Sequence, residues 1–523
     1  MPSPREIGGG IMRDTCRRPL LCVLLLAAAV SLARAETTRL CVFHTNDIHG
    51  WIQARPAPFY KANPARLIGG APALANAIRK LKRPEESCLL LDAGDWFQGT
   101  PEGTIPRGRA LAEIFNAMGY DAVEIGNHEF DFGESELKRL VSAVRVPVLG
   151  ANVKVAATGS RVAYLKPHVL RTVGGVRVGI FGLLTTNMRH LSFMRNIEGL
   201  AFSPEIETAR ESVAELRAKG AEIVIALTHV GVEQPGREAF IGDQAIAAAV
   251  GGIDLIVGGH THTALAHPIR DSKNGTLIVQ AGHYLTRVGK VEIEFDAKAR
   301  RVVSLNGRLR DLWVDEFGED PAVSAIVKKY QNEVGRELDV VVATAAEALH
   351  RDREAESSLG DWMTDCERNW TKTQVAFQNA GGIRAELSAG PVRLRNLFEI
   401  MPFDNRIVTL KMTGAQLREL LERGVGGSAG MLQVSGLTMR YSPAAPAGAR
   451  VRAISIDNKP LADDAVYSVS ASDFMVDGGD GYSAFAKGTD KLYTDTLLRD
   501  MLAGCARAGS PIRVPRAGRI YKE

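Results

Sequence analysis

Short apolar runs alternate with amphipathic stretches along the chain from Thr38 to about Leu312. Near-continuous runs of Val, Ile and Leu are typical of strands that are covered on both faces. Residues 291–295 and 302–305 alternate apolar and polar positions, which indicates an antiparallel pair. The continuous runs predict strands at residues 40–43, 88–91, 122–125, 146–149, 176–181, 222–227, 253–257 and 277–280.

Amphipathic helices are predicted between these strands, at residues 70–82, 110–118 and 134–144. This half of the chain therefore predicts a layered α/β domain. A further helix opens at Asp320-Pro321, because proline is favoured at the first helical position. It lies in the charged segment 315–336, which we interpret as a linker. Beyond it, predicted helices at 358–371, 414–422 and 495–506, with strands of their own, indicate a second α/β domain.

The first 35 residues have the pattern of a targeting segment. Arg13, Arg17 and Arg18 precede an apolar run at residues 20–30 that is too short to span a bilayer, and Ala33-Arg34-Ala35 matches an A-x-A cleavage site. An uncleaved anchor is the alternative, but no longer apolar run supports it. We expect an exported mature protein, periplasmic or extracellular, without a stable membrane anchor. The predicted division is 1–35, 36–314, 315–339 and 340–523.

Composition narrows the class of protein. A length of 523 residues suggests two to four domains, and 45% hydrophobic with 24% charged residues is ordinary for a globular protein. The net charge of +4 is small, and no basic stretch is dense enough to indicate a nucleic-acid polymer or a membrane surface as partner.

Four cysteines follow the targeting segment: Cys41, Cys88, Cys366 and Cys505. Export permits disulfides, and four cysteines allow three full connectivities. Because Cys41 and Cys88 each lie in an apolar run that predicts a strand, we expect them to be buried free thiols. No C-x-x-C spacing indicates a metal or redox site.

Polar side chains follow one predicted strand after another in the first domain. The carboxyl ends of parallel strands meet at one edge of a sheet, so these side chains are expected to converge. Carboxylates, imidazoles and an amide without cysteine form a borderline-hard metal site. The number of ligands exceeds what one tetrahedral ion needs, which favours two ions bridged by a carboxylate. The expected ligands are Asp47, His49, Asp95, Asn127, His229, His260 and His262.

These motifs resemble a known family. Asp47-x-His49, Gly94-Asp95, Gly126-Asn127-His128-Glu129, His229 and Gly259-His260-x-His262 together are similar, in order, to the signature of the calcineurin-like metallophosphoesterases. The segments 45–50 and 126–133 resemble the 5′-nucleotidase branch of that superfamily. The resemblance runs from about Leu40 to Asp480. It implies a metallophosphoesterase β-sandwich flanked by helices at residues 36–314, and a nucleotide-binding α/β domain at 340–523.

The resemblance implies a role for each of these residues. Asp47, His49 and His262 would hold one divalent ion, and Asn127, His229 and His260 the other, with Asp95 bridging both. Zn, Mn, Co or Fe would suit such ligands. His128 would stabilise charge on the phosphate or protonate the leaving alkoxide, and Asp131 would fix its orientation. Glu129 is left with helix-start electrostatics only.

The second domain would bind the nucleotide. Arg353 and Arg384 are similar to the family's phosphate-binding arginines, whose guanidinium groups match phosphate geometry. Phe403 and Phe474 resemble the two aromatic elements that stack on a nucleobase. The remaining expected substrate-binding residues are Asn379, in an N-x-G-G-[IV]-R element, and Asp480, at the ribose-contacting position.

The expected activity is hydrolysis of nucleoside 5′-monophosphates to nucleoside and phosphate. UDP-sugars, nucleoside di- and triphosphates, or 2′,3′-cyclic nucleotides are alternative substrates of the same site. A catalytically silent nucleotide-binding surface protein, or a hydrolase of sulfur esters, are alternatives from other classes. His44 is expected to support the first motif and His283 to lie beside the site or on the surface, with no role predicted for His168, His190, His267 and His350.

Overall fold

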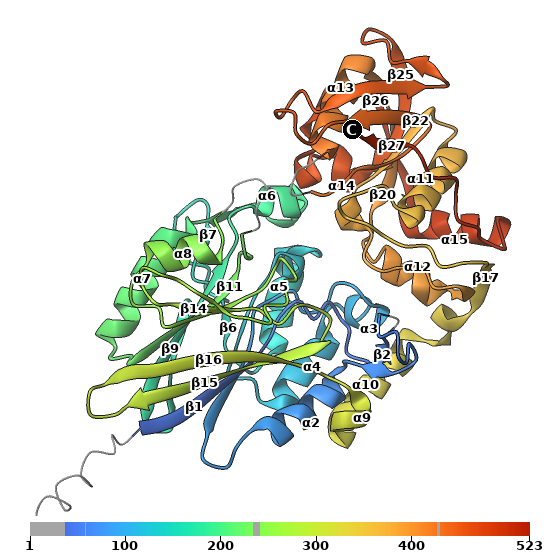
Figure 1. Cartoon of the computed structure of the whole chain (residues 1–523). Coiled ribbons are helices and arrows are strands. Elements are labelled where there is room, and N and C mark those ends of the chain that lie inside the picture. The colour runs from blue at the N-terminus through green and yellow to red at the C-terminus, as the bar shows by residue number, and fades with distance from the viewer. Residues whose placement is uncertain (1–36, 58, 234–240, 426–428) are drawn as a thin grey trace, which may run out of the picture.

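The structure, a computed structural model, describes residues 37–57, 59–233, 241–425 and 429–523 (Figure 1). The predicted targeting segment, residues 1–35, lies outside the described residues. Among the helices that are described, none has the length and apolar character needed to cross a bilayer. The two predicted α/β parts lie side by side, with the C-terminal part packed over one end of the N-terminal part (Figure 1).

Two six-stranded sheets form the N-terminal part. The first has the order β16-β15-β1-β4-β5-β6, from β1 (Thr37–Thr45), β4 (Ser87–Asp92), β5 (Ala122–Glu124), β6 (Val148–Leu149), β15 (Arg287–Asp296) and β16 (Arg301–Asp311). The second has the order β13-β14-β12-β11-β9-β8, from β8 (His168–Val173), β9 (Val176–Leu184), β11 (Ile223–His229), β12 (Leu255–Gly258), β13 (Ile269–Arg270) and β14 (Leu277–Val279). The central strands of each sheet are parallel, and β15 and β16 form the predicted antiparallel pair.

Strand β1 shows why the apolar runs are continuous. Leu40 and Val42 point into the core between the two sheets. Cys41 and Phe43 point to the opposite face, where helices cover the first sheet. These helices are α2 (Ala71–Leu81), α4 (Arg109–Met118) and α5 (Glu134–Ala143), while α7 (Glu205–Ala218) and α8 (Asp243–Ala249) cover the second sheet. Both faces of each strand are therefore buried, as the pattern predicted.

The helix predicted as a linker is α10 (Pro321–Val334). Asp320 caps its first turn, with its side chain accepting a hydrogen bond from the amide of Val323. Val327 and Tyr330 are buried in the same core as α2 and α4. Helix α10 is therefore packed on the N-terminal part, and the chain crosses to the C-terminal part after Gly335.

A five-stranded sheet is the centre of the C-terminal part, in the order β21-β18-β25-β20-β26. Its strands are β18 (Val375–Gln378), β20 (Arg406–Thr413), β21 (Gln433–Ser435), β25 (Val466–Ser472) and β26 (Thr489–Leu497). One core contains α11 (Ser358–Thr371), α12 (Leu394–Ile400) and α15 (Leu498–Ala508). A second hydrophobic core contains α13 (Gly414–Gly424) and one face of a four-stranded sheet. The strands of this sheet are β22 (Leu437–Tyr441), β23 (Val451–Ile456), β24 (Lys459–Pro460) and β27 (Ile520–Lys522).

One helix start was predicted wrongly. Residues 495–497 were expected to open a helix, but they end β26, whose Leu497 pairs with Arg406 of β20. Strand pairing overrides the local helical pattern here. Helix α15 therefore begins at Leu498, directly after the end of β26.

The expectation of free thiols was also wrong. Cys41 is bonded to Cys88, and Cys366 to Cys505. Cys41 and Cys88 are register partners on the parallel strands β1 and β4, with Cα atoms 4.4 Å apart. An apolar run hides this, because the register between two strands far apart in sequence cannot be read from either run alone.

Candidate functional site

The seven residues predicted to bind metal come together at the carboxyl ends of strands from both sheets. Asp47 and His49 follow β1, Asp95 follows β4 and Asn127 follows β5. From the second sheet, His229 is the last residue of β11, and His260 and His262 follow β12. Six of the seven fall into three groups whose ligand-type atoms lie within 4.8 Å of one another: Asp47 with His49 and His262, His49 with Asp95 and the neighbouring His128, and Asp95 with His229 and His260. The seventh, Asn127, has its Oδ1 3.0 Å from Nδ1 of His260. The predicted convergence is therefore present, but at the edge of two sheets rather than one.

The backbone at these positions is unusual. Non-glycine residues rarely adopt a positive φ, and several together at one site indicate a conformation that the surroundings impose. The residues with positive φ here are Asp47, His49, Asp95, His260 and His262. Close packing explains the neighbouring glycine, since a Cβ on Gly126 would lie 2.2 Å from Oδ1 of Asp95. The backbone of the turns after these strands therefore directs the ligand-type side chains toward one another.

Backbone carbonyl groups fix the orientation of two imidazole rings. Nδ1 of His49 lies 2.8 Å from the carbonyl oxygen of Gln98, and Nδ1 of His229 lies 2.7 Å from that of Ala93. Each Nδ1 therefore donates a hydrogen bond to the carbonyl, and this turns Nε2 of each ring toward the cluster. Nε2 of His229 is 3.1 Å from Oδ2 of Asp95, but outside hydrogen-bond geometry. Orientation of this kind is usual for histidines that bind metal.

The electrostatics of the cluster suit a cation. Burial, together with the charge of Arg384, holds the pKa of His49 well below its ordinary value. Burial also lowers the pKa of His260 to about 4 and that of His262 well below its usual range. Neutral imidazoles are the form that binds metal. Nε2 of His49 is 3.0 Å from Nε2 of His262, so two ring nitrogens that could bind a metal lie side by side.

Asp95 is the centre of negative charge in this cluster. Burial raises its pKa, but the positive charges of His229 and His128 outweigh burial and hold the pKa well below its usual range. In turn, burial lowers the pKa of His229, but Asp95 raises it to about 10. The carboxylate of Asp95 thus stabilises a positive charge next to it, where Nε2 of His229 lies. The donor set fits a bound divalent cation, with Asp95 central to it.

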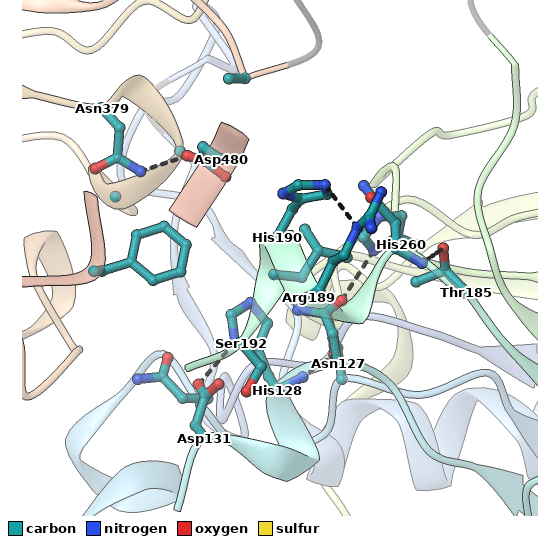
Figure 2. Close-up of a pocket in the computed structure, with 18 of the residues that line it drawn as sticks. Asn127, His128, Asp131, Thr185, Arg189, His190, Ser192, His260, Asn379 and Asp480 are labelled. Carbon is teal, nitrogen blue, oxygen red and sulfur yellow. Dashed lines mark hydrogen bonds and ion pairs between the residues drawn. The ribbon is translucent and has the colours of Figure 1, made fainter. Parts of the chain in front are cut away.

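His128 and Asp131 form the predicted pair. Nδ1 of His128 is 2.8 Å from Oδ2 of Asp131, at either end of a short 3₁₀ turn, η1 (His128–Phe130). Burial lowers the pKa of His128, but Asp131 and Asp95 together raise it above its ordinary value. The amide of His128 donates to Oδ1 of Asp95 at 3.0 Å. Asp131 therefore occupies Nδ1, and Nε2 is left for the cavity, which both residues line (Figure 2).

Glu129 differs from its sequence interpretation. Its carboxylate does not serve the start of a helix; it accepts hydrogen bonds from the backbone amides of Asp95, Trp96 and Gly126, at 3.0, 2.8 and 2.6 Å. The side chain is buried and ties the end of β4 to the end of β5. Two of its partners, Asp95 and Trp96, lie 33 or more residues away along the chain, so no local sequence pattern could reveal these hydrogen bonds.

A cavity of about 1020 Å³ lies between the two parts of the chain. The N-terminal part contributes Asp95, Asn127, His128 and His260 to its lining. All six residues that were predicted to bind a nucleotide line the same cavity: Arg353, Asn379, Arg384, Phe403, Phe474 and Asp480. Ligands of the kind that bind metal and residues of the kind that bind nucleotides therefore face the same cavity (Figure 2).

Several contacts join the two faces of the cavity. Nη2 of Arg384 is 3.2 Å from Nε2 of His49, and the ring of Phe403 stacks on that of His128 with centroids 5.7 Å apart. The hydroxyl of Tyr284 donates to the carbonyl of Arg384 at 3.1 Å. On the far side, Nδ2 of Asn379 donates to Oδ2 of Asp480 at 2.6 Å, as Figure 2 shows.

Part of the cavity wall has no signal in the sequence. His190 was given no role, yet it lines the cavity beside Arg189, whose Nε donates to Nε2 of His190 at 3.1 Å. Gln98 also lines it and donates to the carbonyl of Pro402 at 3.1 Å. These residues belong to no motif, and the partner of Gln98 comes from the second part of the chain. His283 lies beside the site, stacked on His262 at 4.9 Å.

Comparison with known proteins agrees with this arrangement. Residues 41–264 match the calcineurin-like phosphoesterase family, and residues 340–487 match the 5′-nucleotidase C-terminal domain. The chain is 30% identical to a 5′-nucleotidase of Bos taurus over 89% of its own length and 88% of that protein. The chain belongs to the 5′-nucleotidase family. It is also 29% identical to the solved 5′-nucleotidase precursor of Thermus thermophilus, with a TM-score of 0.85 over 92% of this chain and 99% of that one.

The fold of the 5′-nucleotidase family extends to other chemistry. A sulfate thiohydrolase from Thermus thermophilus shares the fold, with a TM-score of 0.77 and 20% sequence identity, over 92% of this chain and 96% of that one. Fold likeness alone therefore does not fix the substrate of a chain in this class. The substrate has to be argued from the cavity.

Proposed function

We propose that the chain is an exported nucleotidase that uses two divalent ions to hydrolyse nucleoside 5′-monophosphates to nucleoside and phosphate. One observation carries the proposal: Asp95, His260 and His262 of the cluster line the same cavity as the arginine and phenylalanine residues. A phosphate ester needs positive charge at the phosphate and an apolar surface for a base, and both are present within that space.

The metal ligands in this proposal are those of the sequence analysis. Asp47, His49 and His262 would hold one ion, Asn127, His229 and His260 would hold the other, and Asp95 would serve both. Divalent ions at these positions would acidify water and neutralise charge on the phosphoryl oxygens. The neutral His49, His260 and His262 and the anionic Asp95 support this assignment.

The protein's own groups complete the reaction. Water oxygen attacks phosphorus in line with the bond to the nucleoside 5′-oxygen, and that bond breaks. His128 gives the proton on Nε2 to the leaving alkoxide, while Asp131 keeps Nδ1 oriented. Arg384 and Arg353 bind phosphate oxygens. Burial lowers the pKa of His262, and the positive charge of Arg353 lowers it further. Burial raises the pKa of Asp480, and the charge of Arg353 partly offsets this rise, which supports a position of Arg353 between the metal cluster and the ribose end of the cavity.

The base and ribose are assigned to the C-terminal side. Phe403 and Phe474 would stack on the base, which tolerates any nucleobase because each presents a π face. Asp480 and Asn379 would contact the ribose. In this proposal the two parts separate to admit substrate and close to react, so closure gates turnover. Because α10 is packed on the N-terminal part, we place the hinge after Gly335.

Export is supported by the covalent structure. Two disulfides form and persist in an oxidising compartment, which agrees with a periplasmic or extracellular location.

A substrate panel tests the proposed function. Purified protein is assayed for phosphate release from AMP, UDP-glucose, ATP and 2′,3′-cyclic AMP, and for sulfate release from a thiosulfate ester, with elemental analysis of the same preparation. We expect AMP to give the highest kcat/KM. A higher kcat/KM for another compound of the panel would make that compound, and not a nucleoside 5′-monophosphate, the preferred type of substrate. Tight nucleotide binding without turnover in any metal would indicate a silent binding protein.

A further inference from the structure

One segment of the N-terminal part reaches the proposed base-binding end of the cavity. It consists of helix α6 (Met188–Leu191) and the 3₁₀ turn η2 (Met194–Asn196), with Ser192 and Phe193 between them. Helix α6 packs against η5 (Gly479–Gly481), the turn that carries Asp480. Figure 1 shows α6 at the border between the two parts, next to α14 (Asp473–Val476). We call this segment the α6–η2 segment.

Phe193 of this segment contacts Phe474. The two ring centroids are 5.8 Å apart and the planes are at 87°, an edge-to-face arrangement that aromatic pairs prefer. Both side chains are only partly buried, and both line the cavity. Their contact therefore joins the N-terminal part to the ring that is assigned to the base.

The neighbours of Phe193 hold it in place. The guanidinium of Arg195 lies 4.0 Å from the centroid of the Phe193 ring, in a cation–π geometry. Burial raises the pKa of Asp473, next to Phe474, and the positive charge of Arg195 partly offsets this. Nδ2 of Asn196 donates to the carbonyl of Asp131 at 2.7 Å, which anchors the end of the segment to the catalytic turn.

From this geometry we infer that Phe193 completes the nucleobase subsite from the N-terminal part, so that the enzyme selects phosphate monoesters carrying an aromatic base over those without one. The inference rests on the proposed function and deepens it. The pocket for the base is then shared between the two parts, and closure brings its third aromatic side chain against Phe474. A base-free ester meets the metal ligands and phosphate arginines but gains nothing from Phe193.

The alternative is that Phe193 only packs the two parts together. Packing of that kind would affect every substrate equally, because the active site forms between the same two surfaces. Discrimination between substrates with and without a base therefore separates the two explanations.

The experiment compares Phe193→Ala and Phe193→Tyr with the unaltered enzyme, using AMP and ribose 5-phosphate as substrates. Met194→Ala is the matched control, because Met194 is the next residue, is 62% exposed and does not line the cavity. Calorimetry measures the binding of adenosine, which needs neither the phosphate subsite nor turnover.

We expect Phe193→Ala to raise KM for AMP and Kd for adenosine by about threefold to tenfold, as expected for losing one aromatic contact. The kcat/KM for ribose 5-phosphate should stay within about twofold, and Phe193→Tyr and Met194→Ala should resemble the unaltered enzyme. Equal losses on both substrates, or an unchanged Kd for adenosine, would overturn the inference. An unaltered enzyme that binds adenosine but does not hydrolyse AMP would refute the proposed function alone, and the adenosine Kd of Phe193→Ala would still decide this inference.

Discussion

The carboxylate of Glu129 holds the backbone amide of Asp95 at 3.0 Å. It accepts the amides of Trp96 and Gly126 as well, so one buried side chain fixes the turns after two neighbouring strands. Asp95 has positive φ and lies at the centre of the predicted metal cluster. Glu129 therefore supports the proposed metal site without lying among its proposed ligands.

Replacing Glu129 with glutamine tests this support. The amide would present N–H groups to backbone N–H donors, and the Asp95 turn would lose part of its hydrogen bonding. Loss of such supporting contacts costs about 10–100-fold in metal affinity. Calorimetric titration of metal into the metal-free protein should show a drop of this size for Glu129→Gln. Glu134→Gln, on the partly exposed start of α5, is the control and should bind metal normally. Equal affinity of both variants would mean that Glu129 only stabilises the fold.

Asp131→Asn should slow the chemical step. Asparagine keeps the size of the side chain but removes the charge that raises the pKa of His128 and holds its Nδ1. General acid catalysis contributes about 10²–10⁴-fold, so kcat for AMP should fall by about 10²-fold with a smaller change in KM. Steady-state kinetics measure this, with Glu136→Gln as the control at a partly exposed position that forms an ion pair with Arg139. A kcat within twofold of the unaltered enzyme would remove Asp131 from the catalytic pair.

Much of the fold and of the site follows from the sequence. Continuous apolar runs such as β1 and β11 have few other interpretations, and the ligand-type residues directly follow them. The position of each such residue can be predicted from the end of its own strand. These residues meet in one site because neighbouring parallel strands end at the same edge of a sheet.

The remainder depends on contacts between distant segments. The Cys41–Cys88 disulfide needs the register of β1 against β4, and the role of Glu129 needs the approach of β4 to β5. Phe193 and His190 lie in a segment without a motif, and the cavity that they line is completed by residues of the second part such as Phe474. A single sequence does not contain these distances in any local pattern.

Joining the two parts covalently should impair turnover. Arg395 of α12 forms an ion pair with Glu102 of α3 (Pro101–Thr104) across the interface. The double variant Glu102→Cys with Arg395→Cys offers two thiols for a short bismaleimide, since all four cysteines among the described residues are in disulfides. If closure gates turnover, crosslinking should lower kcat for AMP by about tenfold or more.

The same double variant treated with a monofunctional maleimide controls for the loss of the ion pair. Its kcat should remain close to that of the untreated variant. Full activity of the crosslinked protein, with the crosslink verified by mass spectrometry, would show that the two parts need not move apart.

A buried carboxyl group in the C-terminal part should make stability depend on pH. Burial raises the pKa of Glu367, on α11, to about 8. Between the ordinary carboxyl pKa and about 8, the folded protein holds a proton that the unfolded chain releases, so stability falls as the pH rises through this window. Glu367→Gln is neutral at every pH and should lack this loss.

Thermal unfolding at pH 5 and pH 8 measures the effect. We expect similar Tm values for both proteins at pH 5, and a Tm for Glu367→Gln that is higher by a few degrees at pH 8, on the order of the shift that ~1–2 kcal/mol produces. A difference between the proteins that does not vary with pH would contradict the raised pKa.

The central claim is that the cluster around Asp95 binds divalent metal and hydrolyses nucleoside monophosphates. The most direct measurement is phosphate release from AMP by metal-free protein with and without added divalent ions, for the unaltered chain and for Asp95→Ala, with elemental analysis of each. We expect two ions per chain and strictly metal-dependent release, which Asp95→Ala lowers by roughly 10³-fold or more, beyond the loss of a single electrostatic contact. Metal-dependent AMP hydrolysis that is unchanged in Asp95→Ala would contradict this claim.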